Sequence, residues 1–569
     1  MKNTPILSLA ISALIFAGCS NSSESKQKAK PKLILQITVD QLRADLPLKI
    51  MDRLPKGGFR YLYDNGVVYQ DAHHNHANTE TVTGHATLAT GAHPADHGMV
   101  SNLWYDRASG QAVYNVEDHK YPLIGSSIGV DKNTEIDPTQ AAANTDGRSP
   151  KMILASTFSD ELHKATDGAA KIFGVSVKDR GAITLAGQNG KAFWFSKASG
   201  NFISSTYYYT DYPGWVSEWN EKKQYTTYAN TTWGLSQEES GYMFSNSDDA
   251  SYKTKFPGFG IHFPHEFGEL DNRYFTTFLT LSPVGDELTL SFTKSLLEAE
   301  DIGTDEITDF LAVSFSSTDY VGHVFGPSSI ESEDNLFRLD RSIASLLELV
   351  DKKVGLENTL IVFSSDHGAV DAPPILQAKG IDAGYIDVSA FDLELLNALV
   401  KNKLQINLDV VSAFSYPYIY LDLEKMRLAN IGSNQVFPVI KSHLESTEGI
   451  MEVVDCKSLY TKKTTVDDHY KLILNNYNPQ RSGDFAVVVK PYWYINDFEG
   501  LMVATTHGSP WEYDSHVPMI FAGNGLKPQK ISRKTYSIDI AVTLSQYLSI
   551  QAPSKATGTA LKETLSNKN

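Results

Sequence analysis

The residues of this sequence that can do chemistry are aspartates and histidines in segments that a fold can bring together. Asp319 and His323 are four residues apart in DYVGH, so a helical turn there points both side chains to one face, where they can bind one metal ion. A lone Asp or His usually has a structural role, but several such residues in one chain favour a site. Mixed Asp and His ligands without a usable thiolate are typical of Zn²⁺. The candidate ligands are Asp40, Asp319, His323, Asp366, His367 and His507.

A candidate nucleophile lies in the segment NTETVTGHATLATG, which begins at Asn78. Thr79, Thr81 and Thr83 stand just before a helical pattern. Where a strand turns into a helix, one hydroxyl is exposed at the helix N-terminus, and the backbone N–H groups and the helix dipole there favour an anion. Helix capping by a threonine is the alternative interpretation of the same residues.

The elements that must position these residues alternate between strand-like and helix-like patterns. KLILQITVD is a continuous apolar and β-branched run that stops at Asp40, as a buried parallel strand does. The Leu and Ile spacing over 332–354 predicts a helix. We therefore expect an α/β fold with a central, mostly parallel sheet flanked by helices, and ligands beyond the carboxyl ends of its strands. Three later runs repeat the design of the first strand: FLAVSFSSTD, TLIVFSSDHG and VPMIFAG, the last from Val517 to Gly523.

Two stretches fit this core less well and are expected to be inserted subdomains. Residues 192–270 are crowded with aromatic side chains, which favours an ordinary packed cap over a ligand platform. Residues 375–500 hold mixed β-like runs and form the second expected insertion. The catalytic core then consists of three parts, at 33–191, 271–374 and 501–569.

The N-terminus has the pattern of an export signal. Lys2 is followed by an apolar run from Ile6 to Ala17 that is too short to span a membrane. Its ending, LIFAGC, resembles a bacterial lipoprotein signal, so we expect a signal peptide at 1–18 and a lipid anchor on Cys19; an ordinary cleaved signal is the alternative. Residues 19–32 are Ser- and Lys-rich, which predicts a flexible tether. With Cys19 lipidated, Cys456 has no partner for a disulfide and is expected to be a buried apolar residue.

Composition and charge exclude several classes of protein. With 41% hydrophobic and 21% charged residues the chain is globular rather than disordered. Its 50 basic and 67 acidic residues give a net charge of −17, which argues against diffuse attraction to nucleic acid. An anionic substrate must therefore be attracted locally, by a metal ion or a few placed cations.

Taken together, these segments resemble the alkaline phosphatase superfamily, and within it the bacterial exported phosphatases with a threonine nucleophile that are related to nucleotide pyrophosphatase/phosphodiesterases. The order Asp, Thr, Asp-x-x-x-His, Asp-His, His-Gly is preserved from Leu33 to about Pro518. The resemblance implies Thr81 as the nucleophile, because the family nucleophile stands four residues before the histidine that is His85 here. It also implies two Zn²⁺ ions: one held by Asp40, Asp366, His367 and Thr81, the other by Asp319, His323 and His507.

The same resemblance assigns phosphate-binding residues. Asn102 matches the asparagine that donates to a phosphate oxygen. Lys178 and Arg180 stand where the monoesterase members carry a Lys-x-Arg pair, and a dianionic monoester gains from such extra cations. We therefore expect an exported, lipid-anchored and monomeric enzyme of the periplasm or outer membrane that hydrolyses small-molecule phosphate monoesters through a phosphothreonine. His73, His74 and His76 are expected to be structural.

Alternatives remain open from the sequence. A phosphodiesterase or nucleotide pyrophosphatase would use the same two metal ions. A sulfatase would need a Cys/Ser-x-Pro-x-Arg motif, which does not occur here, and a phosphosugar mutase normally uses serine. A surface lipoprotein that binds nutrients without catalysis is the more remote alternative.

Overall fold

A computed structural model describes residues 30–566 of the chain, apart from 126–129, 463–466 and 499. The expected signal peptide at 1–18, the lipid anchor on Cys19 and the tether as far as residue 29 lie outside the described residues. Within the described part, no helix has the length and apolar character needed to cross a membrane.

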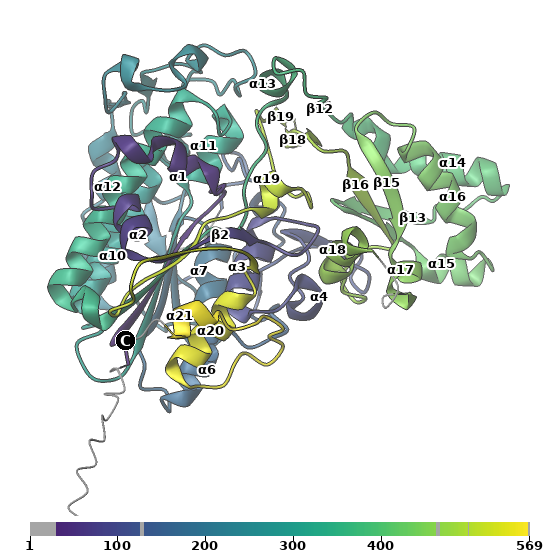
Figure 1. The fold of residues 1–569 in the computed structure, drawn as a ribbon. Coiled ribbons are helices and arrows are strands. Elements are labelled where there is room, and N and C mark those ends of the chain that lie inside the picture. Colours follow the sequence, from purple (N-terminus) through teal and green to yellow (C-terminus); the bar gives the residue numbers. More distant parts are fainter. Residues whose placement is uncertain (1–29, 126–129, 463–466, 499, 567–569) are drawn as a thin grey trace, which may run out of the picture.

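A nine-stranded sheet forms the centre of the molecule, and it is mostly parallel, as predicted (Figure 1). Its strand order is β21-β2-β20-β11-β1-β10-β5-β6-β7. Neighbouring strands from β11 through β1, β10 and β5 to β6 run parallel, as do β2 and β21. The bounds are β1 Leu33–Val39, β2 Val67–His73, β5 Ile172–Ser176, β6 Lys191–Ser196, β7 Asn201–Ile203, β10 Asp309–Phe315, β11 Thr359–Ser364, β20 Met519–Gly523 and β21 Gln529–Tyr536.

One strand runs in a direction that the sequence analysis did not predict. The segment from Val517 to Gly523 was expected to repeat the design of the parallel strands, but β20 is antiparallel to both β11 and β2. Met519 at its start pairs with Ser364 at the end of β11. The chain therefore re-enters the sheet from the edge where the parallel strands end, and this forces the opposite direction.

Helices cover both faces of the sheet, because side chains of a strand alternate between its faces. In β1, Leu33, Leu35 and Ile37 pack in one apolar cluster, whereas Ile34 packs in another. The first cluster includes residues of α2 (Phe59–Asn65), α10 (Val284–Ala299) and α12 (Ile330–Lys353). The second includes residues of α3 (Thr81–Thr90), α6 (Phe158–Ala165), α7 (Asp179–Ala186) and α20 (Asp539–Leu548).

The segment 375–500 contains a second sheet, which forms a lobe beside the core (Figure 1). The strand order in this sheet is β13-β14-β16-β15, and it has its own apolar cluster. The strands are β13 Val411–Ser415, β14 Tyr418–Leu421, β15 Ile450–Asp455 and β16 Phe485–Val489, and the helices packed on them include α14 (Leu393–Leu404) and α16 (Ser433–Leu444). Cys456 is buried in an apolar cluster at the border of this lobe, as expected.

The aromatic stretch lies mainly against the core. β6 and β7 are strands of the central sheet, so the sheet extends to Ile203, beyond the boundary expected at residue 192. Farther along, Trp219 and Trp233 are buried in the apolar cluster that α10 and α12 share. These rings contribute to a packed subdomain.

Candidate active site

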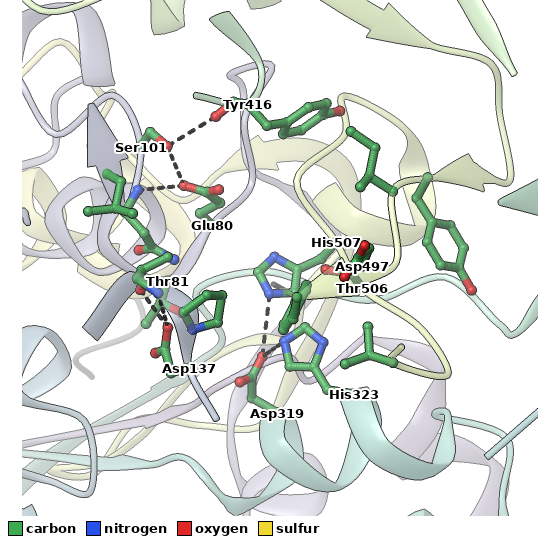
Figure 2. Close-up of a pocket in the computed structure, with 18 of the residues that line it drawn as sticks. Glu80, Thr81, Ser101, Asp137, Asp319, His323, Tyr416, Asp497, Thr506 and His507 are labelled. Carbon is green, nitrogen blue, oxygen red and sulfur yellow. Dashed lines mark hydrogen bonds and ion pairs between the residues drawn. The ribbon is translucent and has the colours of Figure 1, made fainter. Parts of the chain in front are cut away.

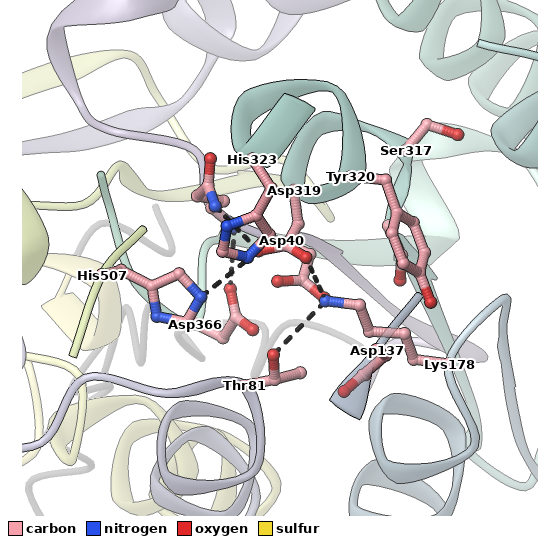
Figure 3. Close-up of polar contacts among 12 residues, drawn as sticks. Asp40, Thr81, Asp137, Lys178, Ser317, Asp319, Tyr320, His323, Asp366 and His507 are labelled. Carbon is pink, nitrogen blue, oxygen red and sulfur yellow. Dashed lines mark hydrogen bonds and ion pairs between the residues drawn. The ribbon is translucent and has the colours of Figure 1, made fainter. Parts of the chain in front are cut away.

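The carboxyl ends of three adjacent strands carry the candidate ligands to one place (Figure 3). β1 and β10 pair in register up to Val39 and Phe315, and β1 and β11 up to Thr38 and Ser364. The three strands therefore end at the same level. Asp40 follows β1 directly, Asp319 lies in the first turn of α11 (Ser317–Phe325) after β10, and Asp366 follows β11.

Asp40, Asp366 and His367 form a buried group whose ligand atoms lie within 4.8 Å of one another. His367 Nε2 is 3.4 Å from Asp40 Oδ1 and 3.5 Å from Asp366 Oδ2. Both carboxylate oxygens of Asp40, Asp366 Oδ2 and His367 Nε2 are buried and make no hydrogen bond among the described residues. They do make ion pairs: Asp40 Oδ2 lies 2.9 Å from Lys178 Nζ, and Asp366 Oδ2 lies 3.0 Å from His85 Nδ1. Such atoms are costly to bury unless they are paired or bind a cation. This donor set therefore fits a metal ion.

Asp319 is the centre of a second group. The Nε2 atoms of His323 and His507 lie 3.2 and 3.4 Å from the same oxygen, Asp319 Oδ1. The rings of His367 and His507 stack with their centroids 3.7 Å apart, and His367 also lies within 4.8 Å of the ligand atoms of Asp319 and His507. The two groups are therefore adjacent, with His367 at their border.

The histidines are held so that their ε nitrogens face the carboxylates. Each Nδ1 lies at hydrogen-bond distance from a backbone carbonyl: 2.9 Å for His323, 2.9 Å for His367 and 2.8 Å for His507. A carbonyl only accepts, so each Nδ1 carries a proton, and Nε2 is the ring atom left to bind a metal ion. This is the arrangement by which outer hydrogen bonds orient metal-binding histidines.

Gln41 connects the two groups, and the sequence analysis missed it. Its backbone N–H donates to Asp366 Oδ1 at 3.1 Å, and its side-chain Nε2 donates to Asp319 Oδ1 at 2.8 Å. The left-handed backbone of Gln41, with φ of 67°, allows both contacts. A Cβ on Gly322 would lie 1.8 Å from Gln41 Oε1, which explains the glycine in DYVGH.

The electrostatics of the site favour cations. Burial opposes ionisation of Asp40 and Asp319, but the Lys178 ammonium and the neighbouring histidines together outweigh it, so the pKa of both carboxyls lies well below the usual range. Burial and the charge of Asp40 raise the pKa of Asp366. At His367, burial lowers the pKa, but the charges of Asp366 and Asp40 outweigh it and raise it to about 9. A positive charge is thus stabilised where these carboxylates meet.

Thr81 is the first residue of α3 and its hydroxyl points at two cations. Thr81 Oγ1 lies 3.4 Å from Lys178 Nζ and 3.3 Å from Arg180 Nη2. The capping contact at this helix end is made by Thr83, whose Oγ1 accepts from the backbone N–H of Glu80 at 2.9 Å. The alternative role of helix capping therefore belongs to Thr83, and Thr81 Oγ1 faces the cavity that contains the predicted site.

Lys178 and Arg180 are both buried, and acidic partners hold them. Lys178 Nζ lies 2.9 Å from Asp40 Oδ2 and 2.5 Å from Asp319 Oδ2. Arg180 Nη1 lies 2.8 Å from Asp137 Oδ2 and 3.2 Å from the hydroxyl of Tyr114. Asp137 and Tyr114 were not predicted, and nothing in their sequence neighbourhood marks them as partners of an arginine far along the chain.

Asn102 is oriented by backbone contacts. Its Oδ1 accepts from Val82 N–H at 3.1 Å, which leaves the side-chain Nδ2 to donate elsewhere. Its own backbone N–H donates to Glu80 Oε2 at 2.5 Å, and Ser101 Oγ donates to the same oxygen at 2.8 Å. Burial raises the pKa of Glu80, although these hydrogen bonds oppose the shift.

A cavity of about 390 Å³ opens over these residues (Figure 2). Thr81, Asn102, Lys178 and Arg180 line it, together with Asp319, His323 and His507. The structure therefore brings the predicted nucleophile, phosphate-binding residues and one predicted metal group to one cavity, with the other metal group buried beneath it.

The three upstream histidines do not line this cavity. His73 bonds Asp71 at 2.7 Å and stacks on His516, and His74 bonds the carbonyl of Ser365 at 3.0 Å. His76 is fully buried, and its two ring nitrogens have no partner among the described residues.

Comparison with known proteins agrees with this fold and site. Residues 34–510 match the model of the type I phosphodiesterase / nucleotide pyrophosphatase family. The chain therefore belongs to that family, which is part of the alkaline phosphatase superfamily.

Three relatives span nearly the whole chain. A Myroides odoratus protein named calcium-transporting ATPase is 33% identical over 95% of this chain and 96% of its own length. Alkaline phosphatase PhoV of Synechococcus elongatus is 33% identical over 97% of this chain and 98% of its own length. Alkaline phosphatase PafA of Elizabethkingia meningoseptica is 31% identical over 98% of each chain.

The fold is also that of a solved alkaline phosphatase. A crystal structure of PafA covers 94% of this chain and 99% of its own, with a TM-score of 0.85 and 30% identity. A solved mutant of PafA carries substitutions at a threonine, an asparagine, a lysine and an arginine, in that order. One residue separates that lysine from that arginine, as Asp179 separates Lys178 from Arg180 here.

Proposed function

We propose that this protein is an alkaline phosphatase that hydrolyses phosphate monoesters and releases inorganic phosphate through a phosphothreonine on Thr81. The observation that carries the proposal is the Thr81 hydroxyl, which lies 3.4 and 3.3 Å from the cationic atoms of Lys178 and Arg180 beside two groups of metal-binding side chains. The names of PhoV and PafA support the same activity.

Two Zn²⁺ ions are the proposed cofactors. Asp40, Asp366 and His367 would hold one beside Thr81, and Asp319, His323 and His507 would hold the other. When bound, Zn²⁺ supplies positive charge that lowers the pKa of a hydroxyl or water and stabilises negative charge on oxygen. The clustered, buried carboxylate oxygens and Nε2 atoms described above support this assignment.

The residues of the chain then perform two in-line displacements. Thr81 Oγ1 gives its proton to water and attacks phosphorus while the bond from phosphorus to the ester oxygen breaks, and the departing alkoxide takes up a proton from water to leave as the alcohol. Lys178, Arg180 and Asn102 Nδ2 donate to the non-bridging oxygens, where negative charge is concentrated in the transition state. A water molecule next attacks phosphothreonine, which restores the Thr81 hydroxyl and releases phosphate.

Lys178 and Arg180 favour monoesters over diesters. A monoester has three non-bridging oxygens and two negative charges, and a guanidinium can donate to two oxygens at once. The second candidate is a phosphodiesterase or nucleotide pyrophosphatase, which the description of the matching family favours. The two candidates differ in whether the substrate places a second ester group where these cations lie.

The test is kcat/KM of the zinc-loaded protein for an aryl phosphate monoester and for its methyl diester. We expect a large preference for the monoester, and we expect Arg180→Ala to lower monoester kcat/KM by about 100-fold or more while changing the diester value much less. Thr81→Ala serves as the inactive reference. A diester preference, or equal losses on both substrates in Arg180→Ala, would overturn the choice of monoester.

We also propose that the protein is exported and held at the periplasmic side of the envelope or the outer membrane by a lipid on Cys19, where it acts as a monomer on small phosphate esters. The signal-like sequence at 1–19 supports this. Cys19→Ala is expected to move the protein from the membrane fraction to the soluble fraction. Unchanged membrane retention would contradict the lipid anchor.

A further inference from the structure

The cavity over Thr81 is larger than a phosphoryl group requires. Its volume of about 390 Å³ is more than ten times the volume that one water molecule occupies in liquid water, about 30 Å³. A phosphoryl group and the attacking hydroxyl occupy a small part of that space. The size is instead that of sites that enclose most of a small organic molecule.

The extra space is bounded by apolar side chains from one part of the chain. The core contributes Thr81, Asn102, Lys178 and Arg180 to the cavity. The second insertion and the residues just after it contribute a wall that is rich in aromatic and aliphatic groups. We name this surface the insertion wall and define it by Phe414, Tyr416, Tyr494, Ile495, Phe498 and Leu501.

Packing holds the insertion wall in place. The ring of Phe414 stacks on Phe391 with centroids 4.1 Å apart and an interplanar angle of 6°. The hydroxyl of Tyr494 donates to the carbonyl of Ala504 at 2.9 Å. Phe414 and Phe498 nevertheless stay partly exposed, so each offers ring surface to a ligand.

The insertion wall begins at the side of the site where the alcohol must leave. In an in-line displacement the leaving oxygen lies opposite the attacking Thr81 Oγ1. Thr81 and His323 lie at opposite ends of the group of polar residues (Figure 3). The ring of Phe498 packs against His323 with centroids 5.1 Å apart. An alcohol that departs past His323 therefore meets Phe498 first.

We propose that the insertion wall is a leaving-group subsite for neutral, aromatic alcohols, an inference that rests on the proposed phosphatase function. Among the described residues that line the cavity, Lys178 and Arg180 are the only lysine or arginine, and both face the phosphoryl position. Asp497, which also lines the cavity, would repel an anionic leaving group such as a second phosphate. Flat rings stack well on other aromatic rings, and burying one removes apolar surface from water.

The experiment compares benzyl phosphate with ethyl phosphate, whose alcohols are both alkyl and nearly equal in acidity, so that chemistry contributes little to the ratio. We expect kcat/KM for benzyl phosphate to exceed that for ethyl phosphate by about tenfold in the zinc-loaded protein, since about 1.4 kcal/mol of apolar contact has this effect. Phe414→Ala and Phe498→Ala should each lower this ratio about threefold or more, because each removes ring surface that a benzyl group can contact.

The matched control is Phe437→Ala, which removes a partly exposed ring of the same insertion that packs on Phe485 outside the cavity. This variant should keep the wild-type ratio. Phe414→Leu and Phe498→Leu keep apolar volume in case an alanine variant does not fold. A wild-type ratio near one, or a ratio unchanged in both cavity variants, would overturn the subsite.

Binding without turnover separates the subsite from the proposed function. Calorimetry should show tighter binding of phenylphosphonate than of methylphosphonate, and Phe414→Ala should reduce that difference. Equal affinity for the two phosphonates would count against the subsite whatever the activity. Failure to hydrolyse either ester, with phenylphosphonate still favoured, would instead overturn the phosphatase function and leave an aromatic binding site.

Discussion

Arg180 is the residue whose position depends most on partners far away in the sequence. Its Nη1 is held by Asp137 and Tyr114, so that Nη2 faces Thr81. Tyr114 in turn donates to Asp179 Oδ1 at 2.5 Å, and Arg148 lies 2.6 Å from Asp179 Oδ2. Burial opposes the charge of Asp137, but Arg180 together with nearby lysines and a hydrogen bond outweighs it, so the pKa of that carboxyl lies well below the usual range. The guanidinium is therefore fixed before any substrate arrives.

Asp137→Asn tests whether this positioning matters for the reaction. Asparagine keeps an oxygen that can accept from the Thr139 N–H, which Asp137 accepts at 3.0 Å, but it weakens the contact with Arg180. We expect monoester kcat/KM to fall about tenfold, because one charged hydrogen-bond partner contributes roughly 1.5 to 3 kcal/mol, and the diester value to change less.

The control for this change is Glu135→Gln. Glu135 belongs to the same loop but pairs with Lys197, not with Arg180. It should keep the monoester preference of the wild type. An Asp137→Asn variant with unchanged or higher monoester kcat/KM would show that Arg180 does not need this partner.

At the residue scale, types, spacing and the family resemblance predicted candidate ligands that the structure brings together, but not the side chains that hold them in place. Asp319 and His323 were predicted to act together because residues four positions apart lie on the same face of a helix. Gln41, Asp137 and Tyr114 were missed, because their contacts join segments far apart in the chain and no local pattern records such a contact.

At the scale of elements, the register of three strands determines where the site forms. The sequence patterns predicted the mostly parallel sheet and the helix at 332–354, which the structure has as α12, Ile330–Lys353. The direction of β20 was not predictable from its apolar run, because parallel and antiparallel buried strands have similar composition. Direction depends on which edge the preceding loop reaches.

A buried carboxylate ties α12 to α2, away from the site. Asp340 Oδ1 accepts from the N–H of Phe59 at 2.6 Å, and Asp340 Oδ2 has no partner among the described residues. Burial raises the pKa of Asp340 from 3.8 to about 6, although the hydrogen bond from Phe59 opposes the shift. The folded protein thus binds this proton more tightly than the unfolded chain. Its contribution to stability is full below about pH 4 and is lost as the pH rises to about 6.

Asp340→Asn should remove this pH dependence, because the amide does not ionise. The Tm of the variant minus that of the wild type should increase between pH 4 and pH 8. The increase should correspond to a change of up to about 3 kcal/mol in the free energy of unfolding. Thermal unfolding of both zinc-loaded proteins across this range measures it. A difference that stays constant with pH would show that Asp340 titrates normally in the folded protein.

At the scale of the whole molecule, a negatively charged protein encloses a local site for an anion. The net charge is −17, yet Lys178 and Arg180 meet in one cavity between the core and the second insertion. The negative net charge predicted that an anionic substrate would have to be attracted by a few cations at the site itself. The wall that the insertion contributes to the cavity was not predicted, because composition identifies an insertion but not the surface it presents.

Metal removal tests how the whole molecule depends on this buried charge. Asp40, Asp319 and Asp366 are at most 2% exposed, and bound cations would offset the cost of burying them together. A chelator should therefore lower Tm by about 5 °C and abolish phosphatase activity, and added Zn²⁺ should restore both. Asp366→Asn should show a smaller chelator shift, whereas Asp340→Asn, which alters a buried carboxylate outside the site, should keep the full shift. If chelated and zinc-loaded proteins unfold at the same temperature, these carboxylates do not hold a metal ion that stabilises the fold.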